Sequence, residues 1–324
     1  MFYEFANFIV ESPPEEINSE ALRIALQLAL LLNCEIIQDT QIMRKTVIDG
    51  SNTSGFQRTV LIAKNGYIET SLGKVGIQSI CLEEDAARIV ETDSVDKKSP
   101  EPKNQGFSGK NKVIYRLDRL GIPLVEIATN PDIKTPGQAK ETALLLGEIL
   151  RACQVKRGLG TIRQDVNLSI NVNGETSERV EIKGFQDIKT VEKTIELEIK
   201  RQVELVRKNK SISEVRRANE DGTTTFLRPM PGGARMYPET DLPLLHISRD
   251  MINEAKAKLP RLKSEIKDEL RKHGLNEELV RLLADTKKIE DFQELIQVYN
   301  KPDVIAKMLT IWISDLASKE KKSR

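Results

Sequence analysis

The spacing of apolar residues changes along this chain, and the change limits the folds it can adopt. Residues 20–33 have the helical period, with Ser19 predicted as the N-cap. From about residue 42 to residue 127 the pattern is mostly short β-strands separated by turn residues. From residue 250 to residue 317 the helical period returns. We therefore predict an α+β fold, with a domain built on antiparallel sheet followed by an all-helical domain.

Local signals add detail to this outline. Asn65-Gly66 and Asn173-Gly174 each lie between alternating apolar runs and predict the tips of two hairpins. Residues 94–112 are polar and rich in Pro, Gly and Lys, which predicts a mobile loop. Thr135-Pro136 predicts the start of one helix, and a second long helix is predicted over about 191–208.

A domain boundary is predicted near Leu242–Ile247, where the irregular segment after the last strands gives way to helices. The predicted domains are therefore residues 1–242, which form a sheet-based cradle, and residues 243–324, which form the helical domain.

Composition excludes several classes of function. The 50 basic and 49 acidic residues nearly cancel, so no overall basic excess indicates nucleic acid, although a local basic face remains possible. The three cysteines are far apart in apolar contexts and are predicted to be reduced core residues of a cytosolic protein. No apolar run is long enough to span a bilayer. Of two histidines the first is His246, which excludes a histidine-based triad or zinc site from the first 245 residues.

One carboxylate interrupts an apolar strand. Leu124, Val125, Ile127 and Ala128 predict a short buried strand, and Glu126 lies in its middle. An ionised carboxylate there is unfavourable unless it is paired, hydrogen-bonded or bound to a cation.

A second acidic cluster, Glu83-Glu84-Asp85, ends another apolar run. Glu83 and Glu84 would either cap a strand end while Glu126 pairs with an arginine, or join Glu126 in a magnesium site, because Mg²⁺ prefers carboxylate oxygens. The residues alone leave both interpretations open. The arginines that could pair with Glu126 are Arg88, Arg116 and Arg119.

Three loops combine arginine with glycine, and together they suggest a phosphate-rich ligand. They span residues 44–59, 157–165 and 228–241, and neither a P-loop nor a G-x-G-x-x-G motif accompanies them. Each loop alone is a weak signal, whereas three loops beside a carboxylate set favour a nucleotide site. The candidate nucleotide contacts are Arg44, Lys45, Ser51, Arg58, Arg116, Arg119 and Arg163.

Six motifs that follow one another along the chain together resemble those of a known protein family. They read "RKTVIDGSNTSGFQRT", "LEEDAARI", "YRLDRLGIPLVEIATNPDI", "RGLGTIRQDVNLSI", "VEIKGFQDI" and "GGARMYPETDLP". This set resembles the family formed by the B-type and E-type subunits of tRNA-dependent amidotransferases, which have a kinase-like cradle. The spelling of the first loop and of "YPETD" is closer to the E-type subunit of the archaeal glutamyl-tRNA(Gln) enzymes than to the B-type subunit.

The resemblance implies a function. ATP phosphorylates the side-chain carboxylate of glutamate misacylated onto tRNA(Gln), and ammonia then displaces the phosphate. The D-type subunit, an asparaginase-like amidohydrolase, supplies the ammonia, which implies a cytoplasmic heterodimer or a dimer of heterodimers without membrane contact. By motif match, Glu83, Glu84 and Glu126 would be the Mg²⁺-site carboxylates and the catalytic residues.

Three family features are missing from this sequence. An N-terminal "GLEIH" strand, a synthetase-like insertion after "VRKNK" and a tRNA-binding tail have no counterpart. We expect a truncated or split protein, whose first domain is incomplete at its N-terminus. The alternative expectation is a non-catalytic fragment that binds the D-type subunit or tRNA.

Overall fold

The computed structural model divides into two compact units. One comprises residues 1–147 and 155–259, and the other residues 148–154 and 260–324. The residues that the structure describes are 14–47, 52, 54–92, 113–156, 158, 160–230, 236–286 and 288–322. The predicted mobile loop, 94–112, lies outside them.

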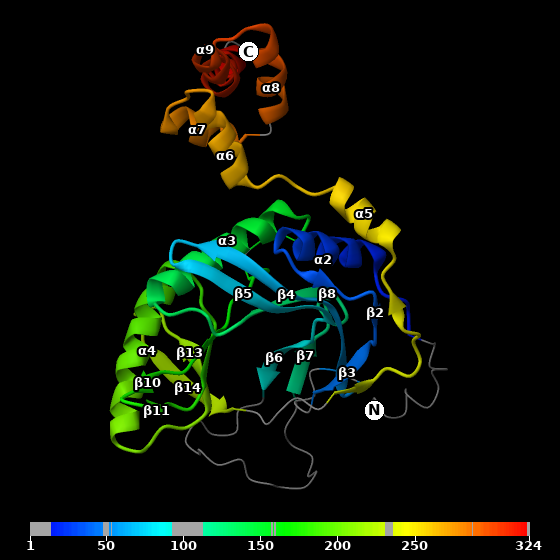
Figure 1. Cartoon of the computed structure of the whole chain (residues 1–324), viewed down its shortest axis with the longest axis vertical. Helices are drawn as coiled ribbons and strands as arrows, with labels where there is room; N and C mark the ends of the chain where they lie inside the picture. Colours follow the sequence, from blue (N-terminus) through cyan, green and yellow to red (C-terminus); the bar gives the residue numbers. More distant parts are fainter. Residues whose placement is uncertain are drawn as a thin grey trace. The chain divides into compact units, whose positions relative to one another are not determined.

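A strongly curved antiparallel sheet forms the centre of the first unit (Figure 1). Its strand order is β15-β3-β4-β5-β8, and the short strand β1 also pairs with β4. The long hairpin β4–β5 therefore supplies the middle of the sheet. The strands are β1 (Glu35–Ile36), β3 (Met43–Thr46), β4 (Phe56–Thr70), β5 (Gly73–Glu84), β8 (Pro123–Thr129) and β15 (Met236–Pro238).

One face of this sheet is covered by helix α2 (Ser19–Leu31), as Figure 1 shows. Leu22 and Leu26 of the helix pack against Val60 and Leu82 of the sheet. The helix begins one residue earlier than predicted, because Asn18 rather than Ser19 is the N-cap. The Asn18 side chain accepts a hydrogen bond from the backbone of Ala21 at 2.9 Å.

Helix α5 (Arg249–Ala257) belongs to this unit as well, since it packs on α2 and its Ala255 is buried in the same core. The division between the units therefore falls after Leu259, one helix later than the boundary expected near residue 242.

The hairpin tip predicted at Asn65-Gly66 is wrong. β4 continues through this dipeptide, and the chain reverses between Thr70 and Gly73. Asn65 takes a left-handed φ of +55° inside the strand, which is why the dipeptide has the composition of a turn.

The predicted hairpin at Asn173-Gly174 is confirmed. Both residues have positive φ, and they connect β10 (Asn171–Val172) to β11 (Glu175–Thr176).

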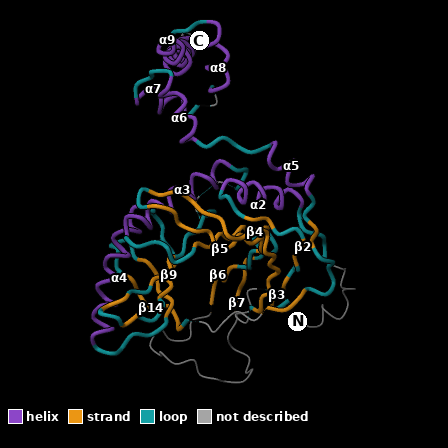
Figure 2. The backbone as a smooth tube through the Cα atoms, in the orientation of Figure 1, coloured by secondary structure: helices purple, strands orange, loops and turns teal. Residues whose placement is uncertain are grey.

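A second sheet has the order β14-β13-β12-β9, and Figure 2 labels its outer strands, β9 and β14. Its strands β12 and β13 are parallel, because helix α4 (Lys189–Arg207) connects them as a crossover; the other pairs are antiparallel. The predicted long helix is thus confirmed. The strands are β9 (Val166–Leu168), β12 (Val180–Lys183), β13 (Glu214–Ala218) and β14 (Thr224–Pro229), and two small pairs are β2 (Asp39–Thr40) with β16 (Leu245–His246) and β6 (Arg88–Thr92) with β7 (Val113–Arg116).

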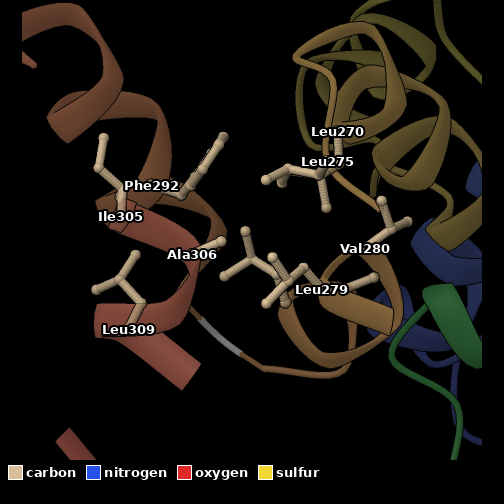
Figure 3. Packing of buried hydrophobic residues seen from close by; sticks show 10 residues of the cluster. Leu270, Leu275, Leu279, Val280, Phe292, Ile305, Ala306 and Leu309 are labelled. Carbon is tan, nitrogen blue, oxygen red and sulfur yellow. The ribbon is translucent and has the colours of Figure 1, made fainter. Parts of the chain in front are cut away.

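The described residues of the second unit are helices and their connections. They include the end of α3 (Pro136–Ala152) and a π-helical stretch, η1 (Met308–Trp312). Phe292, Val280 and Leu309 lie in its core, among the packed apolar side chains drawn in Figure 3. The remaining helices are α6 (Lys263–Lys272), α7 (Glu277–Ala284), α8 (Ile289–Val298), α9 (Pro302–Lys307) and α10 (Ile313–Lys322).

Thr135 caps α3 as predicted, since its hydroxyl accepts a hydrogen bond from the backbone of Gln138. Over the described residues, no helix is both long enough and apolar enough to span a lipid bilayer.

Candidate functional site

The pleat of the main sheet gathers three of the predicted site residues on one face. Successive residues along a strand alternate between faces, and residues paired across antiparallel strands share one. Glu126 on β8 pairs with Cys81 on β5, two residues before Glu83. Lys45 on β3 donates from Nζ to both carboxylate oxygens of Glu83, at 3.0 and 3.1 Å. Because Leu82 points into the core beneath α2, these three side chains lie on the opposite face.

The two carboxylates of this face differ in exposure. Glu83 is buried, with 8% of its surface exposed. Glu126 is exposed, so the expectation of a carboxylate inside a fully buried strand is wrong. The strand itself is confirmed, but β8 lies at an edge of the sheet, and none of its residues is fully buried. Glu126 thus stands on an accessible surface, where a ligand can reach it.

Glu126 has a raised pKa. The surrounding protein partly desolvates its carboxylate, and the negative charge of Glu83 adds to this effect. The interaction with the Glu83 side chain raises the pKa of Glu126 as well. Lys45 opposes the shift because its positive charge favours the ionised form of Glu126. Burial and the neighbouring Glu83 therefore disfavour the ionised form of Glu126, and Lys45 offsets only part of this effect.

A second lysine acts on Glu126 and was missed among the predicted site residues. Lys183, at the end of β12, donates to Asp165 at 3.0 Å and pairs with Glu181 at 2.9 Å. Burial disfavours its charge, but the hydrogen bonds to Glu181 and Asp165 outweigh burial and raise the pKa of Lys183. Its charge in turn lowers the pKa of Glu126. The signal was present in the "VEIKGF" motif, where Lys183 follows a buried strand residue, Ile182.

Glu84 does not join the acid pair. It follows Glu83 directly in β5, so it points to the other face, where it forms an ion pair with Arg58 at 3.3 Å. Arg58 also donates from Nε to Glu239 at 2.8 Å, and Arg44 bonds the same carboxylate. Two predicted nucleotide contacts, Arg44 and Arg58, therefore lie with Glu84 across the sheet from Glu83 and Glu126.

Glu239 is the centre of this second group. Its side chain is fully buried, and the hydrogen bond from Arg44, aided by the backbone of Asp241 and by Arg58, lowers its pKa to about 2. The guanidinium group of Arg44 also stacks 4.7 Å from the centroid of the Phe56 ring. These contacts fasten the segment after β15 to the sheet, which is a structural role.

The remaining predicted nucleotide contacts do not lie together in one group. Arg119 and Arg163 both pair with Asp85, at 2.6 and 3.3 Å. Arg116 is exposed and approaches Asp118 at 3.9 Å. Ser51 lies outside the described residues. The arginine partner considered for Glu126 is not found in the described part of the chain, where its cationic neighbours are lysines.

The acid pair fits part of a magnesium site. Among the described residues, no group of three or more His, Cys, Asp or Glu side chains could hold a metal ion. Mg²⁺ is commonly held by one or two carboxylates, with waters and substrate phosphates completing its shell. Glu83 and Glu126 would supply carboxylate oxygens to such a shell, and a bound cation would favour the ionised form of Glu126.

Comparison with known proteins identifies the family of the sheet-based domain. Residues 4–253 match the model of the GatB/GatE catalytic domain. This match covers most of the chain, which therefore belongs to that family.

Several archaeal relatives are named as the E subunit of glutamyl-tRNA(Gln) amidotransferase. The protein of Methanocaldococcus jannaschii is 35% identical over 95% of this chain and 68% of its own length. That of Pyrococcus furiosus is 33% identical over the same shares, and that of Archaeoglobus fulgidus 32% identical over 92% and 66%. The chain thus spans about two thirds of the length of these relatives. The first alignment extends over 451 residues, so that relative has additional residues within the aligned region.

Proposed function

We propose that this chain carries the ATP-dependent transamidation of Glu-tRNA(Gln) to Gln-tRNA(Gln). The observation that supports this most directly is the Glu83–Glu126 pair facing Lys45 on the accessible face of the cradle sheet. Membership of the GatB/GatE family and the similarity to archaeal E-type subunits also support this proposal.

In this proposal two covalent steps follow each other. An oxygen of the glutamyl side chain attacks the γ-phosphorus of ATP, and the bond to the bridging oxygen breaks, releasing ADP. The nitrogen of ammonia then attacks the acyl carbon, inorganic phosphate leaves, and a proton is lost as the amide forms. Phosphate is a far better leaving group than the oxygen of a free carboxylate, which is what activation achieves.

The residues of the site have separate roles. Glu83 and Glu126 would hold Mg²⁺, which when bound neutralises phosphate charge. Lys45 orients Glu83 through its two hydrogen bonds, and its charge favours the ionised form of Glu126. Lys183 favours the ionised form of Glu126 from the second sheet. Both lysines therefore favour the ionised form of Glu126, which is the form that binds a cation.

The partners follow from the proposed reaction. Ammonia would come from an asparaginase-like amidohydrolase, the D-type subunit, in a cytoplasmic heterodimer or dimer of heterodimers. The other substrate would be tRNA(Gln) charged with glutamate.

The test is an assay of Glu-tRNA(Gln) conversion with ATP, Mg²⁺ and the D-type subunit. Glu126→Gln keeps the shape of the side chain but removes its charge, so turnover should fall at least about a hundredfold. Glu69→Gln is the matched control, because Glu69 is an exposed carboxylate near the other end of β4. Equal turnover in the two variants would remove Glu126 from the site. No turnover in the unmodified chain, even with every component present, would instead favour a non-catalytic fragment.

A further inference from the structure

We infer that Asp85 is a positioning residue that holds Arg119 and Arg163 together as a clamp for the phosphate groups of the nucleotide. This inference rests on the proposed function. It assigns a role to Asp85 and groups two arginines that are far apart in the sequence into one binding site.

Asp85 is itself fixed by the backbone. It follows directly after β5, two residues beyond Glu83 of the acid pair. Its N–H donates to the carbonyl of Ile122 at 2.8 Å, and its carbonyl accepts from the N–H of Gly121 at 3.0 Å. Only 7% of the residue is exposed. The carboxylate is therefore held in one place beside the acid pair.

Each oxygen of this carboxylate holds a different arginine. Arg119 pairs with Oδ2 at 2.6 Å from the turn before β8, and Arg163 pairs with Oδ1 at 3.3 Å from the loop before β9. A guanidinium group has five N–H donors, and each of these contacts with Asp85 uses one terminal nitrogen.

The charges of this group call for an anion. One carboxylate neutralises only one of the two guanidinium groups, so the clamp keeps a surplus positive charge. Guanidinium groups match phosphate oxygens in bidentate geometry, which makes a polyphosphate a suitable ligand. Arg163 has a half-exposed side chain and can reach such a ligand from solvent.

The loop of Arg163 also connects the clamp to the acid pair. Asp165, two residues along the same loop, accepts the hydrogen bond from Lys183, and the charge of Lys183 acts on Glu126. The clamp and the acid pair thus share one border, where the second sheet meets the first. A polyphosphate on the arginines could present its end to an ion on Glu83 and Glu126.

The experiment measures binding of inorganic tripolyphosphate to the full chain by titration calorimetry, without tRNA or any partner protein. In Arg163→Gln the dissociation constant should rise at least about tenfold, as expected for the loss of one charge-assisted hydrogen-bonding group. Arg207→Gln, which removes an exposed arginine from the last turn of α4, should bind as the unmodified chain does. Equal binding by Arg163→Gln and Arg207→Gln would overturn the clamp.

Asp85→Asn separates positioning from simple charge. Removing a negative charge beside an anion site should strengthen tripolyphosphate binding if Asp85 acts only through its charge. Positioning predicts the opposite, a dissociation constant at least about tenfold higher, with partial rescue in Asp85→Glu. Stronger or unchanged binding would overturn the inference. Because this readout needs no turnover, the clamp can stand or fall independently of the proposed reaction.

In the complete assay, the same variant should raise KM for ATP and leave KM for ammonium unchanged. A merely structural defect would instead lower kcat for both substrates, and that result would contradict a positioning role.

Discussion

Lys45 reaches across β4 and holds both carboxylate oxygens of Glu83, at 3.0 and 3.1 Å. The two residues belong to strands that flank β4 on either side. Their bond places one positive charge beside two carboxylates, Glu83 and Glu126, whose interaction raises the pKa of Glu126. The ionisation of Glu126 therefore depends on Lys45 as well as on Glu83.

Lys45→Met should raise the pKa of Glu126 further, because Lys45 now lowers it. If the reaction needs ionised Glu126, the acid limb of the kcat/KM profile should move to higher pH. Lys64→Met, which replaces an exposed lysine on β4, should leave the profile in place. An unmoved acid limb in Lys45→Met would show that Glu126 is not the group that titrates in the reaction.

The division of the predicted site residues between the two faces of the main sheet could have been predicted from the sequence. Glu83 and Glu84 are adjacent in a strand, and so are Arg44 and Lys45, so each pair must divide between the two faces. Applied strictly, this rule places Glu84 apart from Glu83. It does not say which face is covered, because that depends on where α2 packs. Long-range partners such as Asp85 for Arg163 and Asp165 for Lys183 also depend on tertiary structure.

The strands and helices could be predicted from the sequence more reliably than the turns. Hydrophobic periodicity predicted β8, α4 and the helices of the second unit, because burial of one face directly imposes that period. Asn65-Gly66 misled the same reasoning, since a left-handed residue and a close contact inside a strand need the same two residue types as a hairpin turn.

Gly66→Ala should destabilise the first unit. A Cβ at this position would lie 2.2 Å from Sγ of Cys34 and 2.5 Å from the carbonyl oxygen of Leu32, and the latter is backbone that cannot rotate away. We expect a loss of about 1–3 kcal/mol in the free energy of unfolding. Gly137→Ala in the first turn of α3 is the control, because its Cβ would only approach Glu192 at 3.7 Å. It should be neutral or stabilise by up to about 1 kcal/mol; equal losses in urea unfolding would refute the close-contact explanation.

Glu239→Gln should make the free energy of unfolding depend less on pH in the acidic range. The folded state lowers the pKa of Glu239 from 4.5 to about 2, so its contribution is complete above about pH 4.5 and disappears as the pH falls toward 2. The shift corresponds to at most about 3 kcal/mol at neutral pH. Urea unfolding at several pH values should therefore show a large difference between variant and unmodified chain at pH 7 that shrinks below pH 4.5. A difference that stays constant down to pH 2 would mean that packing, not charge, is lost.

Glu198→Ala should loosen α4 from the second sheet. The Glu198 side chain is fully buried in the helix face that packs on the sheet, and it accepts hydrogen bonds from Arg201, at 2.7 Å, and from Thr224 of β14, at 2.9 Å. Removing it leaves these partly buried donors without this acceptor, and we expect a loss of about 3 kcal/mol in urea unfolding. Glu196→Ala, two residues earlier on the exposed side of the same helix, should change stability by less than about 0.5 kcal/mol. Similar losses in both variants would indicate that helix propensity, rather than the buried carboxylate, decides how firmly α4 is held.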